Sequence, residues 1–287
     1  MDKVILIDKP EGLSSHETVS LVKRRLKVRK AGHTGTLDPI ATGLLIICTG
    51  EATKVVRFLT DLPKKYQATI KLGERTETFD SEGTVTGRGP VPADAKPLLE
   101  ALCAFRGRIR QVPPMYSALK VSGTPLYRLA RQGVEVAREE REVEVSELEL
   151  LEYRPPFASL LIACSKGTYI RALADDIGIR AGSCAHMTGL RRTAIGPFDV
   201  RDSAGPEDLV GAKPAAVLDI DQALEFFLEE LRIEGENLKK ALNGAPFRVN
   251  LPTTGNVRIK DPQGRLLGIG TAMKGVVRVE RLLHLSS

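Results

Sequence analysis

The sequence predicts an α+β fold followed by a small all-β domain, and three observations support this. The first part of the chain mixes helix-like and strand-like hydrophobic patterns without the regular strand–helix alternation of a parallel α/β sheet. From residue 232 onward, short strand patterns alternate with turns. The 287 residues are 42% hydrophobic and 27% charged, which is typical of globular domains and not of disordered chains. We therefore predict two domains, at residues 1–231 and 232–287.

Local signals place the N-terminal elements. Ser14 followed by Glu17 is the pattern of a capping box, in which two side chains satisfy free N–H groups at a helix start. A helix is therefore predicted from this box to about Lys27. The stretch 32–43 is dense in glycine and turn-forming residues, and it predicts a loop. Strands are predicted from apolar or alternating runs at 4–7, 44–48 and 66–72.

Hydrophobic spacing places the later elements. Residues 143–150 predict a strand whose alternation slips, as at a β-bulge. Apolar residues at core spacing predict a helix over 169–182. Two further helices are predicted at 97–105 and within 123–133. The remaining predicted strands lie at 158–165, 257–259, 266–269 and 276–282.

The positive charge is concentrated in particular segments. The formal net charge is +6, and residues 231–287 hold ten Lys and Arg against four Asp and Glu, while the rest of the chain holds 32 of each. Six of the eight residues at 23–30 are basic. Arg106, Arg108 and Arg110 alternate, so a strand would place them on one face. These clusters favour a polyanionic partner such as nucleic acid; the alternative interpretation is a solvated surface.

Several classes of protein are excluded by missing patterns. The four cysteines form no C-x-x-C pair and the four histidines are scattered, so no metal site is predicted. The longest apolar run, 44–48, is far shorter than the ~18 residues of a membrane helix. The first residues do not read as a signal peptide, and a cytoplasmic protein without membrane contact is expected. The glycines at 32–35 lack the pattern of a nucleotide-binding loop.

One carboxylate stands out in the loop 32–43. Asp38 is surrounded by glycine and threonine, and Pro39 biases its backbone away from helix. Such a loop can present a carboxylate rigidly at a cleft, where it can serve catalysis. The alternative is that Asp38 only forms a turn, as most Asp-Pro pairs do. The local pattern leaves both interpretations open.

The run GTLDPIATG at 35–43 resembles the catalytic loop of the TruB family of pseudouridine synthases, which reads G-T-L-D-P-x-A-T-G. The resemblance continues in order along most of the chain before the C-terminal segment. Glu77 stands where the family usually has Asp, which keeps the charge. The other similar motifs are DKPEGLSS at 8–15, KY at 65–66, LGERTETFD at 72–80, RG at 106–107, QVPPMYSALK at 111–120, ARQG at 130–133, KGTYIR at 166–171 and LRRT at 190–193.

The resemblance implies a pseudouridine-synthase catalytic fold, with a mixed, mainly antiparallel sheet flanked by helices. It also implies a mobile, thumb-like insertion at about 115–150 and a C-terminal segment similar to a PUA-type RNA-binding domain. Enzymes of this family convert uridine 55 in the T loop of tRNA to pseudouridine. Because the uracil is detached, turned and rejoined to the same ribose, the resemblance implies no cofactor and no metal ion.

The resemblance also implies roles for particular residues. Asp38 matches the catalytic aspartate, which attacks C1′ or C6 or assists deprotonation at C2′; the sequence leaves these alternatives open. Arg171 matches the arginine that pairs with this aspartate and keeps it ionised. The resemblance implies four further substrate-binding residues. Tyr66 stacks on the target base and can assist proton removal, and Tyr169 lines the pocket. Leu190 closes the apolar wall, and His33 fills the space left by the flipped nucleotide or supports the flipped bases.

The implied partner is the T arm of tRNA, bound by a monomer that needs no other protein. One alternative is a related enzyme of the archaeal and eukaryal type, which acts in guide-RNA particles. The ATG ending at 41–43 and the compact length favour the stand-alone bacterial type. A second alternative is a non-catalytic RNA-binding protein on a decayed enzyme scaffold. The retention of Asp38, Tyr66, Tyr169 and Arg171 argues against this second alternative.

Overall fold

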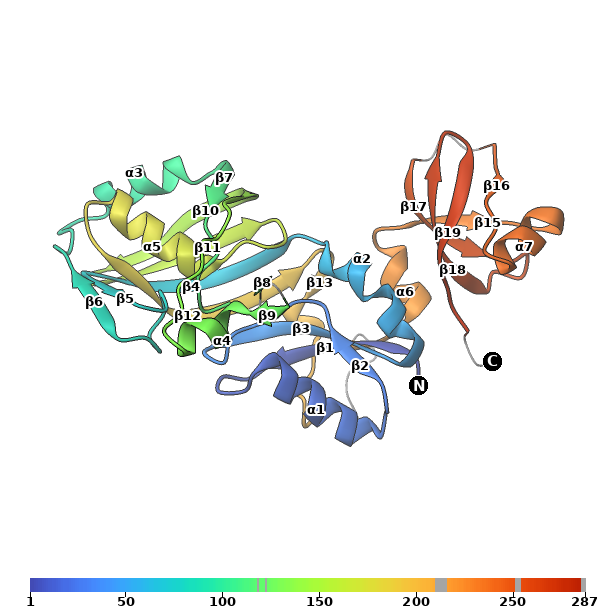
Figure 1. Ribbon diagram of the computed structural model, residues 1–287, viewed down its shortest axis with the longest axis horizontal. Coiled ribbons are helices and arrows are strands. Elements are labelled where there is room, and N and C mark those ends of the chain that lie inside the picture. The colour runs from blue at the N-terminus through green and yellow to red at the C-terminus, as the bar shows by residue number, and fades with distance from the viewer. Residues whose placement is uncertain (118, 122, 210–215, 251–253, 285–287) are drawn as a thin grey trace.

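The computed structural model describes residues 1–117, 119–121, 123–209, 216–250 and 254–284, and one large mixed sheet forms its centre (Figure 1). Among the described strands of this sheet, neighbours are antiparallel except β3 and β12. The predicted α+β class with a mainly antiparallel sheet is therefore confirmed. Across the sheet the strands are β14 (Val217–Asp219), β1 (Lys3–Lys9), β3 (Ala41–Thr49), β12 (Ala185–Ile195), β4 (Lys64–Leu72), β11 (Phe157–Cys164), β10 (Arg141–Arg154) and β7 (Gly107–Gln111), with β2 (Ala31–His33) beside β3 and β13 (Phe198–Asp199) beside β12.

The parallel pairing of β3 with β12 fixes the position of the loop 34–40, because this loop leads directly into β3. Leu190 lies opposite Ala41 in this pairing, and Arg192 lies opposite Gly43. A Cβ atom at Gly43 would lie 2.3 Å from the carbonyl oxygen of Arg192, and its φ of 98° is in the region that favours glycine. The two strands can therefore approach closely only with glycine at this position.

Helix α1 (Ser15–Leu26) covers the end of the sheet formed by β1 and β3 (Figure 1). Its predicted capping box is confirmed, since the Ser14 side chain accepts from the Glu17 backbone N–H and the Glu17 carboxylate accepts from that of Ser14. Val19 and Val22 of α1 pack against apolar side chains of both strands. The helix start is thereby held close to the loop 34–40.

Helices α3 (Lys96–Ala104) and α5 (Ile170–Arg180) lie together over the other end of the sheet (Figure 1). They cover the main apolar core, to which β4, β10, β11 and β12 contribute buried side chains. Strand β10 confirms the predicted slip, because its register with β11 shifts between Val145 and Glu147 and again between Leu150 and Glu152.

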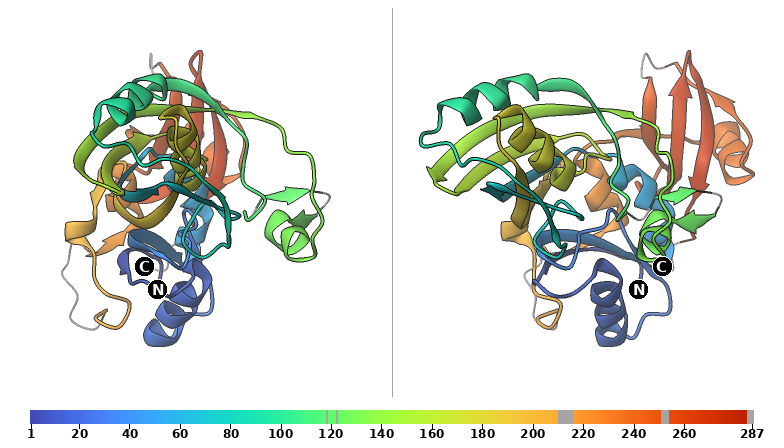
Figure 2. Two further views of the ribbon diagram at one scale, coloured as in Figure 1. Left: turned by 90° about the vertical axis from the view of Figure 1, so that its left-hand side faces the viewer. Right: turned by 60° about the vertical axis from the view of Figure 1, so that its left-hand side comes forward.

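Shorter elements connect these parts. Figure 2 shows that α4 (Leu126–Arg131), with the hairpin of β8 (Lys120–Val121) and β9 (Thr124–Pro125), stands away from the large sheet on two long connections. This segment lies within the predicted insertion, of which residues 118 and 122 are outside the described residues. The other short elements are η1 (Gly50–Val55), α2 (Val56–Thr60), β5 (Glu74–Thr76), β6 (Val85–Arg88), η2 (Val200–Asp202) and α6 (Ile220–Glu225).

A second sheet of five described strands follows at the C-terminal end, with its own apolar core. The predicted all-β architecture of this region is confirmed, and the structure adds one short helix that the sequence analysis did not predict. Residues 251–253 and 285–287 of the predicted domain are outside the described residues. The elements, in sheet order, are β15 (Glu229–Arg232), β17 (Gly255–Lys260), β18 (Leu266–Met273), β19 (Val276–Leu282) and β16 (Phe247–Arg248), with helix α7 (Gly235–Leu242) after β15.

Buried charges join the second sheet to α6. Arg258 and Lys260 of β17 are both buried. Their side chains lie 2.7 and 2.6 Å from the carboxylate of Asp221 on α6, and Lys260 also lies 2.9 Å from Glu230. Removing one partner from such a buried group leaves the others uncompensated, so these ion pairs restrict how the two sheets are oriented.

Candidate active site

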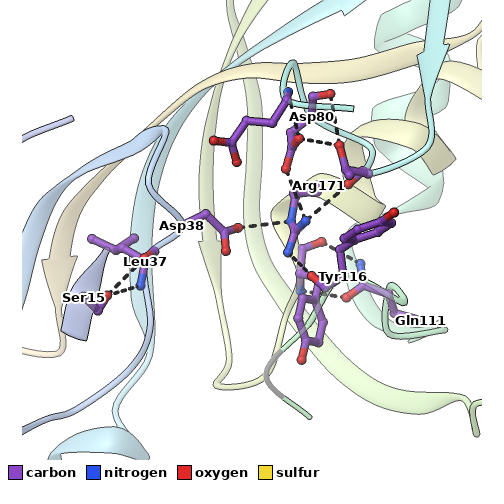
Figure 3. Close-up of polar contacts among 10 residues, drawn as sticks. Ser15, Leu37, Asp38, Asp80, Gln111, Tyr116 and Arg171 are labelled. Atoms are coloured by element: carbon purple, nitrogen blue, oxygen red, sulfur yellow. Dashed lines mark hydrogen bonds and ion pairs between the residues drawn. The ribbon is translucent and has the colours of Figure 1, made fainter. Parts of the chain in front are cut away.

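The loop that carries Asp38 is held on both sides by buried side chains. The Ser15 hydroxyl at the start of α1 donates to the Leu37 carbonyl (3.0 Å) and accepts from the Leu37 N–H (2.8 Å; Figure 3). On the other side, the Lys9 ammonium donates to the carbonyls of Leu13 (2.6 Å) and Pro39 (3.4 Å). Burial lowers the pKa of Lys9 to about 8. These contacts fix the backbone next to Asp38 and leave its carboxylate directed away from the loop.

Arg171 lies between two carboxylates (Figure 3). Its Nε is 3.1 Å from Oδ2 of Asp38, and its Nη1 is 3.2 Å from Oδ2 of Asp80. The third nitrogen, Nη2, donates to the Tyr116 carbonyl at 2.6 Å. The side chain of Arg171 is 8% exposed and that of Asp80 is 2% exposed. A planar guanidinium can serve two carboxylates in this way, whereas a lysine ammonium is a single point charge.

Asp38 is more accessible to solvent than Asp80. The side chain of Asp38 is 34% exposed, so one face of its carboxylate is open. Burial raises the pKa of Asp38 above its ordinary value, Arg171 opposes this shift, and the nearby Asp80 adds to it. The arginine therefore favours the ionised form of a carboxylate that its surroundings would otherwise protonate more readily.

The open face of Asp38 borders a cavity of about 260 Å³. Five of the six predicted site residues line this cavity, and they come from four separate parts of the chain. Strand β4 contributes Tyr66, β12 contributes Leu190, and the start of α5 contributes Tyr169 and Arg171. Burial raises the pKa of Tyr66, so this phenol is neutral at physiological pH. The cavity thus combines aromatic and apolar walls with one ion pair.

His33 is the predicted site residue that the structure places outside this lining. It ends β2, and its Nδ1 accepts a hydrogen bond from the Gly35 N–H (3.3 Å). Burial lowers the pKa of His33, and the positive charge of Arg192 adds to this effect. A neutral imidazole is therefore expected at the edge of the loop that carries Asp38.

Two basic residues at the cavity were missed as individual site residues. Arg192 is 1% exposed and donates to the carbonyls of Leu44 (2.6 Å) and Gly35 (3.2 Å), which ties β12 to the loop 34–40. Lys64 donates to the carbonyls of Thr60 and Leu62, both at 2.5 Å, and burial lowers its pKa to about 8. Arg192 lies within the motif LRRT, so this motif could have identified it as a site residue. No sequence pattern identified Lys64.

The described residues offer no alternative site for a metal ion. Within the described ranges, no group of three or more His, Cys, Asp or Glu side chains is arranged to bind one. The same part of the chain has no helix with the length and apolar character that crossing a membrane requires.

The family regions that match this chain are those of pseudouridine synthases, the class whose catalytic loop the run 35–43 resembles. The chain belongs to the TruB family of these enzymes. The family region described as "TruB family pseudouridylate synthase (N terminal domain)" matches residues 23–170. Two C-terminal regions, described as "tRNA pseudouridylate synthase B C-terminal domain" and "Pseudouridine synthase II TruB, C-terminal", match 171–229 and 230–283.

Similar proteins support this membership over the full length. The chain is 43% identical to "tRNA pseudouridine synthase B" of Pasteurella multocida, covering 99% of this chain and 95% of that protein. It is 44% identical to the protein of the same name from Stutzerimonas stutzeri, covering 98% and 95%. Among solved structures, a chain of a Cbf5-Nop10-Gar1 complex aligns with a TM-score of 0.75 at 28% identity, covering 98% of this chain and 84% of that chain.

Proposed function

We propose that this protein converts uridine 55 in the T loop of tRNA to pseudouridine. The observation that carries the proposal is the ion pair of Asp38 with Arg171 at the edge of a cavity walled by Tyr66, Tyr169 and Leu190. The reaction is an isomerisation. The bond between N1 and C1′ breaks, a bond between C5 and C1′ forms, C5 loses a proton and N1 gains one. No electron acceptor or group donor is required.

In this mechanism Asp38 acts in its ionised form. Detachment of uracil leaves C1′ electron-poor, and a carboxylate can bond to it, attack C6 of the base or assist loss of a proton at C2′. Each of these roles needs a carboxylate with a free oxygen, which the partial exposure of Asp38 provides. Arg171 holds the other side of the same group and keeps it charged.

The target uridine must leave its stack in the RNA to reach Asp38. Extrusion costs a few kcal/mol, and stacking on an aromatic ring recovers part of it. We assign that stacking to Tyr66. Leu190 is assigned to the apolar wall of the cavity, and Tyr169 to a further part of its lining. His33, outside the cavity lining, is assigned to the space that the extruded nucleotide leaves or to support of the extruded bases.

The RNA surface follows from the charge distribution. Lys23, Arg24 and Arg25 lie in the last turn of α1, and we assign them to backbone phosphates. Arg108 and Arg110 of β7 are weaker candidates, since Glu142 of β10 lies 3.7 Å from Arg108 and Glu140, just before β10, lies 3.8 Å from Arg110. We further propose a catalytic domain at 1–231 and a PUA-like domain at 232–287. The second domain is proposed to bind the acceptor side of the tRNA. The insertion was predicted at 115–150, but residues 141–150 belong to β10 of the large sheet. We propose that the part before β10 changes its conformation on RNA binding, which footprinting of this segment with and without RNA would test.

We also propose that the enzyme works in the cytoplasm as a monomer without a guide RNA or a second protein. The test is a single unmodified tRNA transcript incubated with the purified chain, followed by pseudouridine mapping. Modification confined to the T-loop uridine is expected, and a transcript with cytidine at that position should stay unmodified. Tight binding without modification would instead favour the guide-dependent or the non-catalytic alternative.

The pH dependence of the rate should report the ionisation of Asp38. Burial raises the pKa of Asp38 above the ordinary 3.8. As the pH is lowered, the single-turnover rate should therefore begin to fall at a higher pH than it would with an ordinary aspartate. Rates measured from pH 4 to 8 under saturating enzyme check this, with tRNA binding followed in parallel. A rate that stays constant down to pH 4 would contradict the assignment of Asp38 as the ionised catalytic group.

A further inference from the structure

The side chain of Gln111 makes an unusual pair of contacts with one backbone unit. Gln111 is the last residue of β7 and is 3% exposed. Its Oε1 accepts from the Tyr169 N–H at 2.8 Å, and its Nε2 donates to the Tyr169 carbonyl at 3.0 Å (Figure 3). The amide thus pairs with the donor and the acceptor of the same residue, as a neighbouring strand would.

Tyr169 is the N-cap residue, immediately before α5. No side-chain cap is formed by Tyr169 itself, and its carbonyl also accepts the first hydrogen bond of the helix, from the Leu173 N–H at 3.0 Å. The amide of Gln111 therefore holds the point at which the chain enters α5. Arg171 follows in the first turn, so the position of Tyr169 determines where the guanidinium lies.

A second contact joins the same two segments. The Tyr116 carbonyl, five residues after Gln111, accepts from Nη2 of Arg171 at 2.6 Å. Tyr116 is itself held by its hydroxyl, which donates to Glu77 at 2.6 Å. Residues 111–116 thus contact the start of α5 at its backbone and at its arginine side chain.

We propose that Gln111 is a positioning residue, whose amide holds the Tyr169 backbone so that Arg171 stays against Asp38. This proposal rests on the proposed function. The amide fulfils this role at neutral pH because it carries one acceptor and one donor on the same planar group. Glutamate at this position would accept but not donate, and methionine would do neither.

Two variants separate this role from a general structural one. In Gln111→Glu, the single-turnover rate at pH 7.5 should fall about 10- to 100-fold, since small displacements of catalytic groups have effects of this size. The affinity for tRNA should change less than threefold. As the pH is lowered, the carboxyl becomes protonated and regains a donor, so the rate relative to wild type should rise. In Gln111→Met the relative rate should instead fall with decreasing pH, because a displaced Arg171 no longer opposes protonation of Asp38.

The surrounding charges define the controls. Arg171, Asp80 and Lys9 act on Asp38, and Arg141 of β10 lies opposite Gln111 in the strand register. Gln67→Glu provides the matched charge change at an exposed position of β4, and we expect wild-type rates from it at every pH. Thermal unfolding of each variant establishes the folded fraction, and rates are expressed per folded enzyme.

The outcomes are distinct. Opposite pH trends of the relative rates in Gln111→Glu and Gln111→Met support the positioning role. Equal trends in both variants, or rates equal to wild type, would overturn it while the proposed function stands. An inactive wild-type enzyme would instead overturn the proposed function. If Gln111→Met does not fold, the acid-dependent recovery of Gln111→Glu alone decides, because rates expressed per folded enzyme already exclude the stability that protonation of a buried glutamate restores.

Discussion

Asp38→Asn should abolish pseudouridine formation while tRNA binding persists. The amide has nearly the shape of the carboxylate but lacks its charge and nucleophilicity, so the single-turnover rate should fall by at least about 10³-fold. Among the described residues that line the cavity, Asp38 is the carboxylate paired with Arg171, while Asp80 pairs with the same arginine outside this lining. A substitute nucleophile is therefore not expected among the described residues. The measurement is the mapping assay on one tRNA transcript, with affinity determined in parallel.

The same variant should not lose stability. A carboxyl whose pKa is raised in the folded state binds its proton more tightly there than in the unfolded chain, so its ionisation at neutral pH disfavours folding. Replacing it with a neutral amide removes this effect, and the unfolding temperature should equal or exceed that of the wild type. An Asp38→Asn enzyme that modifies tRNA at the wild-type rate would disprove the catalytic assignment.

Short sequence patterns were sufficient to predict those features of the fold that depend on neighbouring residues in the chain. The capping box at Ser14 and Glu17 and the slip in the alternation of β10 both have the predicted form. Strand β12 was not predicted as a strand. Its register with β4 shifts twice, between Met187 and Gly189 and between Arg192 and Ala194, so its apolar residues do not alternate regularly. Its place in the sheet depends on pairing with β3 and β4, which no short segment encodes.

The residues of the candidate site were also only partly predictable from the sequence. Asp38, Arg171 and both tyrosines were found through motifs, and the structure brings them to one cavity. The second carboxylate was not found as a site residue, because Asp80 reaches Arg171 through tertiary contacts. Phe79 before it has a φ of 61°, and its carbonyl accepts from the Met187 N–H on β12 at 3.0 Å. A left-handed phenylalanine is unfavourable alone and persists only where the surrounding structure holds it.

Arg171→Met should reduce both activity and stability, and the two effects should be separable. The rate should fall by about 10²- to 10³-fold, since a preorganised charge next to the reacting carboxylate is lost. The free energy of unfolding should fall by about 3–5 kcal/mol, because the substitution leaves the buried Asp80 without its cation. Asp38 contributes less to this loss, since its exposed face can be hydrated. Urea unfolding and single-turnover rates measure the two effects.

The double variant Arg171→Met/Asp80→Asn distinguishes the two carboxylates. Oδ1 of Asp80 accepts from the Thr78 hydroxyl at 2.5 Å and from the Glu82 N–H at 3.1 Å, and an asparagine oxygen can keep both bonds. Because no buried charge remains unpaired, most of the lost stability should return, while the rate should stay low because Asp38 still lacks its arginine. Recovery of the rate together with stability would mean that Arg171 acts only through the fold. Recovery of stability alone would assign Asp80 to holding the arginine and Arg171 to the chemistry at Asp38.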